Sequence, residues 1–389
     1  EETDPGTWDR GPATKKLVHQ LSSTNDPVLS VTVPASRIIG GYTIEDGKIV
    51  PAFSHGEVIE AVFKRTRVTV GLMTAAKLLS AVEPVIRYHR LRFRGGDASH
   101  PGTPRHDLGL QQKEDARLRL VDIWATGEAA SSLGFATARL FDEYDAVETA
   151  KEEAFAKQGV KGPKAQMRAL MRSRNAALEL AALECEPEGT RNETRRQALM
   201  ADPIARFLVL DAQTNVLCPA CKLWATGVGA TMMREAVALM GGYGITEDCP
   251  GFLPMKWADA QLEATYEGPE AVQRRQLSLT MVNEVFLFFF SKWADEARRI
   301  HAQRPGVGAR SVAAASDLWL WTLKHLQASK DAEGRPLYHG TRQGVAFAMA
   351  DALSWILAAR FQILDVLELD AKGRTNASLS EGLVDLVGF

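Results

Sequence analysis

From about residue 56 to residue 370, apolar residues recur every three or four positions, and this period constrains the fold more than any other feature of the chain. A period near 3.6 places such residues on one face of a helix. In the first segment the series comprises Val58, Val62, Val70, Met73, Leu79 and Ile86. The sequence therefore predicts a mainly α protein whose body is a helical bundle.

The first 55 residues follow a different pattern and are rich in Gly, Pro, Ser and Thr. Within them, residues 27–34 (PVLSVTVP) alternate and are β-branched, which is typical of a strand. Residues 38–47, with Gly40-Gly41 and Asp46-Gly47, indicate a loop or a hairpin. We expect this portion to be the end of a β region.

Breaks in the helical pattern define the expected helices. These are residues 56–88, 108–144, 164–185 and 191–240, a helix beginning at Pro269, and helices within 272–301, 312–329 and 341–370. Pro84 is expected to kink the first helix, and Pro203 and Pro219 to interrupt the fourth. Residues 145–162 are charged and are expected to form a surface excursion.

Composition excludes several classes of protein. With 46 Lys and Arg against 48 Asp and Glu, the net charge is −2, which gives no electrostatic reason to expect a nucleic-acid partner. Hydrophobic residues make up 46% of the chain, too many for a disordered protein. No uninterrupted apolar run reaches the roughly 18 residues needed to span a bilayer. The richest run, residues 285–290 (VFLFFF), is far shorter.

Four cysteines are too few for a disulfide scaffold and fit a reducing compartment. Cys218 and Cys221 form a C-x-x-C pair without the second pair of a zinc site or the strand–helix setting of a redox motif. Two small buried residues are therefore the favoured interpretation. The eight histidines show no metal-binding spacing, so no metal site is expected.

Two turns are candidates for chemistry. Gly241-Gly242-Tyr243-Gly244 follows a long helix, where glycines let the backbone approach a ligand closely or simply cap the helix. Tyr266-Glu267-Gly268 precedes the helix at Pro269, where a carboxylate can be a base or a solvated charge favoured by the helix dipole. Each turn taken alone leaves both interpretations open.

Together and in this order, the motifs resemble those of the acyl-CoA dehydrogenase family. The chain reads GGYGITED at 241–248 and YEGPEAVQ at 266–273, close to the family's G-G-x-G-Y/I-T-E-D and Y-E-G-T/P-x-x-x-Q. Upstream, VPASRIIG at 33–40, FKRTR at 63–67 and YHRLR at 88–92 resemble three further family motifs, and Asp259-Ala260 stands where the family has R-D-A. The resemblance covers residues 27–280 and implies a C-terminal four-helix-bundle domain preceded by the end of the family's middle β domain.

The resemblance implies FAD as cofactor and an acyl-CoA thioester as substrate. In the family, a carboxylate removes the α-proton while hydride passes from the β-carbon to flavin N5, and the thioester carbonyl is polarised by hydrogen bonds. By motif, the base corresponds to Glu267. The resemblance further assigns cofactor binding to Arg92, Gly241, Gly242 and Gln273, and substrate binding to Arg67, Tyr266 and Gly268.

Four positions depart from the family pattern. Ala238 stands in place of the Gln before the two glycines, Pro269 in place of Thr, and Lys64 in place of an acid, while Arg92-Phe93-Arg94-Gly95-Gly96 lacks the Phe of the family's R-x-x-F-G. These departures bear on the FAD contacts. The chain also continues for over a hundred residues after Gln273, as very-long-chain dehydrogenases and acyl-CoA oxidases do. In that extension, Phe286 and residues 288–290 are expected in the core, with docking of a subunit or a peripheral membrane surface as the alternative.

These motifs predict three domains: residues 1–55 as the end of the β domain, 56–284 as the bundle with the flavin and acyl-CoA site, and 285–389 as an extra helical extension. Because the alignment places Glu1 inside the β domain, we expect about 200 further residues upstream, or a separate chain supplying them.

Three functions remain open from the sequence: a dehydrogenase passing electrons to electron-transferring flavoprotein, an acyl-CoA oxidase, and a degenerate structural or assembly subunit. The family further implies a homodimer or homotetramer, in the cytoplasm of a bacterium or the mitochondrial matrix of a eukaryote.

Overall fold

The computed structural model describes residues 8–9, 28–53, 55–92, 109–187 and 189–373. It divides into two compact units, residues 1–66 and 67–389, with the boundary inside the first helix. In the described residues the mainly α fold is confirmed. The α-helices are α1 (His55–Leu91), α2 (Glu114–Lys157), α3 (Pro163–Cys185), α4 (Glu193–Met200), α5 (Pro203–Leu239), α6 (Leu253–Glu263), α7 (Glu270–Thr280), α8 (Glu284–Gln303), α9 (Ala309–Ala328) and α10 (Gln343–Ala371).

The first unit contains two short antiparallel pairs. Strand β1 (Trp8–Asp9) pairs with β2 (Val28–Leu29), which lies within the predicted strand 27–34, and β3 (Tyr42–Glu45) pairs with β4 (Lys48–Pro51). The two residues joining β3 to β4, Asp46 and Gly47, have φ values of +50° and +73°. Two consecutive positive φ angles are the requirement of a tight hairpin turn, which confirms the hairpin alternative.

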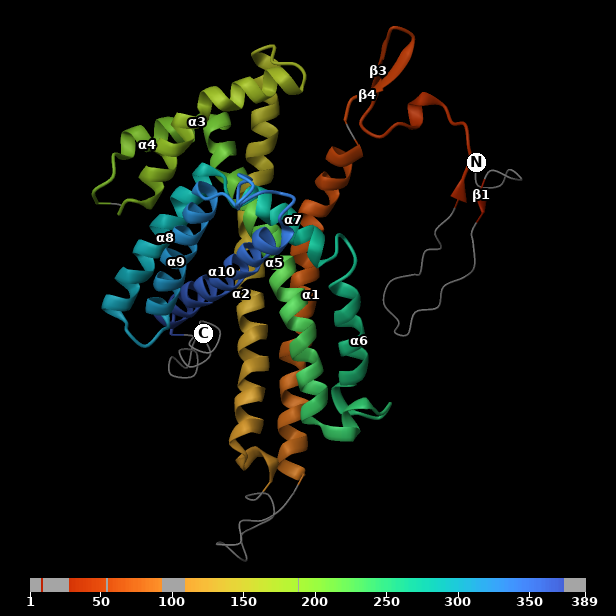
Figure 1. The fold of residues 1–389 in the computed structure, drawn as a ribbon, viewed down its shortest axis with the longest axis vertical. Coiled ribbons are helices and arrows are strands. Elements are labelled where there is room, and N and C mark those ends of the chain that lie inside the picture. Colours follow the sequence, from red (N-terminus) through yellow and green to blue (C-terminus); the bar gives the residue numbers. More distant parts are fainter. Residues whose placement is uncertain (1–7, 10–27, 54, 93–108, 188, 374–389) are drawn as a thin grey trace, which may run out of the picture. The chain divides into compact units, whose positions relative to one another are not determined.

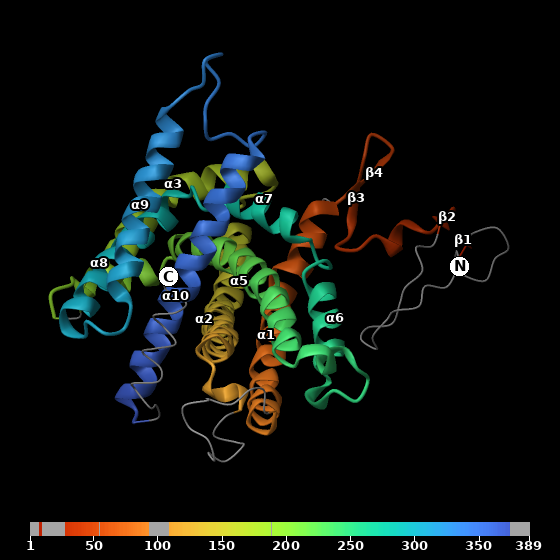
Figure 2. The same ribbon diagram turned by 60° about the horizontal axis from the view of Figure 1, so that its bottom comes forward.

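In the second unit, α5 forms the centre of the bundle. Figure 1 shows α2 and α5 side by side, with α1 and α6 beside them and α8, α9 and α10 on the other side of α2. Figure 2 shows the same neighbours from another direction. Close packing of α1 and α2 depends on Gly127 and Gly134, because a Cβ there would lie 2.9 Å and 2.5 Å from the side chains of Leu79 and Leu72.

The extension shares its core with the bundle. One hydrophobic cluster includes Leu133 of α2, Leu217 and Trp224 of α5, Phe286 and Phe290 of α8. Both phenylalanines are fully buried, as expected, and their rings stack with centroids 5.8 Å apart. The proposed division at residue 284 stays a prediction, while this cluster ties the two parts into one hydrophobic core.

Two expectations about helix bounds need correction. Residues 145–157 belong to α2, because Val147 and Phe155 are buried and continue its apolar face, so the predicted surface excursion shrinks to the loop at 158–162. Pro203 does begin a new helix, with Asp202 as its N-cap, but Pro219 lies inside the continuous α5. Pro84 likewise lies inside α1.

Three described helices, α1, α5 and α10, are long and apolar enough to cross a membrane by length and composition alone. Polar residues interrupt the apolar sequence of each of these helices, so a search for uninterrupted apolar runs does not find them. In α5, 78% of the qualifying window is buried inside the protein, so packing in the bundle core accounts for its apolar character. Cys218 and Cys221 lie on this helix and are buried, as predicted.

Candidate functional site

The Tyr266–Gly268 turn joins α6 to α7 and has an unusual backbone. Glu267 has φ +55° and Gly268 has φ +91°. A positive φ is uncommon for a residue with a side chain and costs about 1 kcal/mol or more. At Gly268 glycine is also required by space, because a Cβ would lie 2.7 Å from Nε2 of Gln273. The turn therefore persists only because neighbouring groups fix it.

Side chains from three helices hold the carbonyl groups of this turn. The Gln273 amide of α7 donates to the Glu267 carbonyl at 3.2 Å and to the Gly268 carbonyl at 2.9 Å. Lys222 Nζ of α5 donates to the Gly268 carbonyl at 3.0 Å and to the Glu263 carbonyl at 3.1 Å. Arg67 Nε of α1 donates to the Glu267 carbonyl at 3.4 Å. All three donors are buried.

Unlike the carbonyl groups of the turn, the Glu267 carboxylate has an oxygen without a hydrogen-bond partner among the described residues. This oxygen, Oε2, is shielded from solvent. A buried acceptor without a donor is unusual and calls for an explanation, since most buried polar atoms are paired. Glu267 Oε2 is therefore a candidate acceptor for a proton or a hydrogen bond from a bound molecule.

Burial and charge shift the pKa values of two groups beside Glu267. Burial lowers the pKa of Lys222 to about 8, with nearby Glu267 opposing this shift and Arg67 adding to it. Burial raises the pKa of Tyr266 to about 12, assisted by Glu263 and Glu267. The Lys222 ammonium also lies 6.0 Å from the centroid of the Tyr266 ring. The Tyr266 side chain is therefore uncharged at physiological pH.

A second buried polar group lies directly behind the turn. Glu263, at the end of α6, has no exposed surface. Its carboxylate accepts a 2.5 Å hydrogen bond from Thr74 Oγ1 and forms an ion pair with Lys77, both on α1. Asp259, one turn earlier, has an unpaired buried oxygen, and burial raises the pKa of its carboxyl group. This cluster joins α6 to α1 and supports the end of α6 from which the turn departs.

The Gly241–Gly244 turn has an open surface. Gly241, with φ +62°, is exposed, and a Cβ at Gly242 would meet nothing within 4 Å. Aromatic rings support it, with the Tyr88 and Tyr243 centroids 6.0 Å apart and the Tyr243 hydroxyl donating to the Asp248 carbonyl at 3.1 Å. Arg92 follows Tyr88 by one helical turn at the end of α1 and is exposed. Residues 93–96, where the family Phe is missing, lie outside the described residues.

The predicted site residues therefore form two groups. Arg67, Gln273 and residues 266–268 are in mutual contact or adjacent, whereas Arg92, Gly241 and Gly242 lie at the far end of the bundle. Along α5, the distance from Lys222 to the helix end before Gly241 is about 25 Å at 1.5 Å per residue. One small ligand cannot touch both groups, but an extended one, or two ligands, can.

Sequence reasoning did not find Lys222, Glu263, Thr74 or Lys77. The available signal was Lys222 itself, a single charge in the apolar stretch 216–226 of a long helix. A lysine almost never becomes fully buried without partners, so its position alone implied a polar site on the neighbouring segment.

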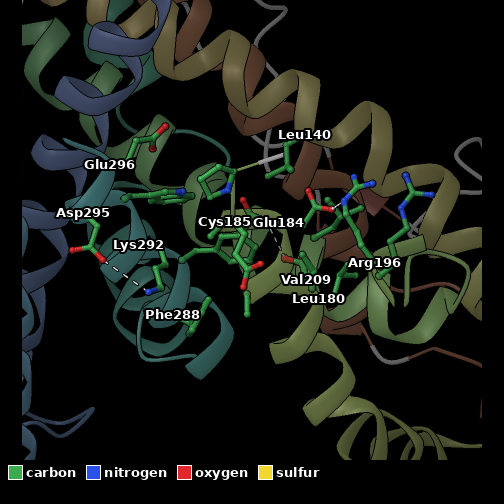
Figure 3. Close-up of a pocket in the computed structure, with 18 of the residues that line it drawn as sticks. Leu140, Leu180, Glu184, Cys185, Arg196, Val209, Phe288, Lys292, Asp295 and Glu296 are labelled. Atoms are coloured by element: carbon green, nitrogen blue, oxygen red, sulfur yellow. Dashed lines mark hydrogen bonds and ion pairs between the residues drawn. The ribbon is translucent and has the colours of Figure 1, made fainter. Parts of the chain in front are cut away.

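A cavity of about 720 Å³ lies elsewhere, between α3, α5 and α8, and none of the predicted site residues lines it. Figure 3 shows Glu184 and Cys185 of α3 opposite Lys292 and Glu296 of α8. Arg196 pairs with Glu184 at 2.6 Å and Arg360 with Glu296 at 2.7 Å, and burial raises the pKa of Cys185 to about 11. The lining is thus largely occupied by its own ion pairs.

Comparison with known proteins now tests the motifs. The family model of the acyl-CoA dehydrogenase C-terminal domain matches residues 148–281, which include both turns. The resemblance to this family is confirmed. No curated protein matches the chain in sequence.

Solved structures share the fold. Arabidopsis thaliana acyl-CoA oxidase 1 is 15% identical with a TM-score of 0.61, over 98% of this chain and 52% of its own. A Bacillus anthracis acyl-CoA dehydrogenase complexed with FAD is 16% identical with a TM-score of 0.58, over 98% and 55%. Caenorhabditis elegans ACDH-11, solved with C11-CoA, is 14% identical with a TM-score of 0.54, over 84% and 42%. The chain thus spans about half the length of these proteins.

Proposed function

We propose that this chain carries the base and part of the cofactor site of an FAD-dependent enzyme that oxidises an acyl-CoA thioester between its α and β carbons. The observation that carries the proposal is the Glu267 carboxylate, whose buried Oε2 has no partner in the part of the chain that the structure describes, on a turn fixed by Arg67, Lys222 and Gln273. The fixed backbone holds the carboxylate in one position relative to a substrate. An oxygen without a partner among the described residues can take a proton, so both properties suit a general base.

Glu267 removes the α-proton in this proposal. The α-proton of a thioester is weakly acidic, so the carboxylate must be partly desolvated and close. The shielded Oε2 meets the first requirement. Tyr266 and Gly268 border the acyl chain, and Arg67 stabilises the turn from α1 while lying beside the thioester site.

The residues at the other end of the bundle fit a dinucleotide. The open backbone at Gly241 and Gly242 allows close approach of a pyrophosphate, and the exposed Arg92 guanidinium offers several donors to phosphate oxygens. Gln273 fits less directly, because its amide nitrogen is engaged by the turn and only its buried Oε1 lacks a partner. When bound, FAD supplies the hydride acceptor for the β-carbon.

The electron acceptor separates two candidate enzymes. A dehydrogenase passes electrons to electron-transferring flavoprotein, and an oxidase passes them to oxygen; both kinds occur among the structures that share this fold. We favour the dehydrogenase, with a homodimer or homotetramer as its assembly, in the bacterial cytoplasm or mitochondrial matrix. Oxygen uptake with peroxide formation would instead identify the oxidase. A structural subunit of the same fold, suggested by Ala238 and Lys64, would hold no flavin.

Glu267→Gln tests the proposal in the natural full-length protein. The variant should fold and retain flavin, but acyl-CoA should bleach its flavin absorbance roughly 10²–10⁴-fold more slowly, since an amide cannot take the proton. Stopped-flow absorbance after mixing with acyl-CoA measures this rate. Glu270→Gln is the matched control, because Glu270 already pairs with Arg274 at 2.9 Å. Normal bleaching in Glu267→Gln would remove Glu267 from the base role.

A further inference from the structure

Lys222 is an exceptional residue in the core of this protein. It lies near the middle of α5, has no exposed surface, and its neighbours Cys221, Leu223 and Trp224 are buried apolar residues. Transferring an ammonium group into such surroundings is costly unless it is paired or hydrogen-bonded. A leucine or methionine at position 222 would avoid this desolvation cost. The interactions that the Lys222 ammonium makes must therefore be explained.

The hydrogen bonds of Lys222 both go to the segment that carries Glu267. Its Nζ donates to the carbonyl of Glu263, the last residue of α6, and to the carbonyl of Gly268, the residue after Glu267. These two acceptors lie on either side of Glu267 in the sequence. One ammonium group therefore ties together both ends of the segment 263–268.

Within the described ranges, the carboxylates near Lys222 have ion-pair partners of their own, except for Glu267. Glu263 pairs with Lys77, and Glu270 pairs with Arg274. Arg67 contributes a second positive charge from α1. Glu267 forms no ion pair among the described residues, and it is the strongest of the negative charges acting on Lys222. The carboxylate beside Lys222 that is not engaged in an ion pair among the described residues is therefore the candidate base itself.

We propose that Lys222 is the positioning residue of the Glu267 turn: its ammonium ties the carbonyls of Glu263 and Gly268 together and so fixes the position of the Glu267 side chain. The inference rests on the proposed function for its catalytic part, whereas the structural part concerns the turn alone. Lys222 does not touch the reacting atoms. By fixing the backbone on both sides of Glu267, Lys222 holds the carboxylate in one position for its reaction.

Three variants of the natural full-length protein separate these two effects. Lys222→Met removes the donors and the charge, and Lys222→Gln keeps donors but removes the charge. Lys151→Met is the matched control, because Lys151 is also buried but lies on α2, 4.0 Å from the Phe207 ring centroid and away from the turn. Hydrogen–deuterium exchange of the amides of residues 264–268 measures the order of the turn, and kcat and KM with acyl-CoA, measured separately, report the placement of the base.

Lys222→Met should speed exchange of these amides roughly tenfold and lower kcat roughly 10- to 100-fold with little change in KM. Lys222→Gln should restore much of the amide protection and of kcat, because its amide keeps donors for the two carbonyl groups. Lys151→Met should change neither readout.

Unchanged exchange in both Lys222 variants would overturn the inference whatever the activity, as would the same shifts in Lys151→Met. A wild-type protein that binds no flavin or is not reduced by acyl-CoA would end the proposed function and the catalytic part of this inference. The exchange measurement would still decide whether Lys222 holds the turn.

Discussion

The two turns that carry the motifs are alike in sequence and opposite in construction. Each contains a glycine with positive φ, Gly241 at +62° and Gly268 at +91°. The turn at Gly241 is exposed and rests on the rings of Tyr88 and Tyr243, so its backbone is accessible. The turn at Gly268 is held by buried donors on its carbonyl groups, which leaves one carboxylate unpaired.

The difference shows that glycine serves two purposes within motifs of similar appearance. In the first turn, Gly242 has open space where a side chain would be and offers its backbone to a ligand. In the second, Gly268 has no such space, because the Gln273 amide occupies it. An exposed turn such as Gly241–Gly244 suits recognition of a large ligand. A turn held by hydrogen bonds to its carbonyl groups, such as Tyr266–Gly268, suits the placement of one reactive group.

Gly244→Ala, in the first turn, is expected to destabilise the fold. In Gly244→Ala the new Cβ would lie 2.1 Å from the Val237 carbonyl oxygen, a backbone atom that cannot move aside. We expect a loss of about 1–3 kcal/mol in the free energy of unfolding, measured by urea denaturation. Gly242→Ala, with nothing within 4 Å, is the control. Equal losses in both variants would contradict the distinction between a structural and an open glycine.

The pH dependence of stability tests the turn at Gly268. The pKa of Lys222 is lowered from 10.5 to about 8 by burial, so the unfolded chain binds more protons between these values. Stability contributed through Lys222 must therefore rise as pH increases from about 8 to 10.5. Thermal melting of wild type and Lys222→Met across this range should show the rise only in wild type. Parallel curves would mean that Lys222 titrates normally in the fold.

Arg92→Ala should have the smallest effect on the fold. Because Arg92 is exposed at the end of α1, its removal should change the free energy of unfolding by less than about 0.5 kcal/mol. If Arg92 binds FAD phosphate, however, flavin affinity should fall roughly tenfold. Fluorescence titration with FAD measures this, with the exposed neighbour Arg90→Ala as control. Identical FAD affinities in the two variants would mean that Arg92 does not bind the cofactor.

Much of the fold could be predicted from periodicity because most helices bury one apolar face. The prediction failed at residues 145–157, where most charged residues face solvent while Val147 and Phe155 still continue the buried face of α2. It also misjudged Pro219, since the surrounding core packing maintains α5 through a residue that usually breaks helices.

The candidate site was predictable only in part. The motifs identified Glu267 and Gln273, but the contacts of Gln273 with the turn depend on how α7 folds back, which no local pattern encodes. Lys222, Thr74 and Lys77 come from helices remote in sequence, and only tertiary packing brings them together. Conversely, Arg92 and Gly241 could be named from their motifs, while their distance from Glu267 followed only from the lengths of α1 and α5.

The left-handed backbone of Glu267 has a consequence for which residue could occupy position 267. With φ at +55°, glycine would adopt this conformation without the penalty of about 1 kcal/mol that glutamate incurs. Folding alone would thus favour a residue with no side chain at all. The glutamate is present despite the local preference of the chain, and the surrounding lysine, arginine and glutamine together offset a conflict between folding and chemistry at a single residue.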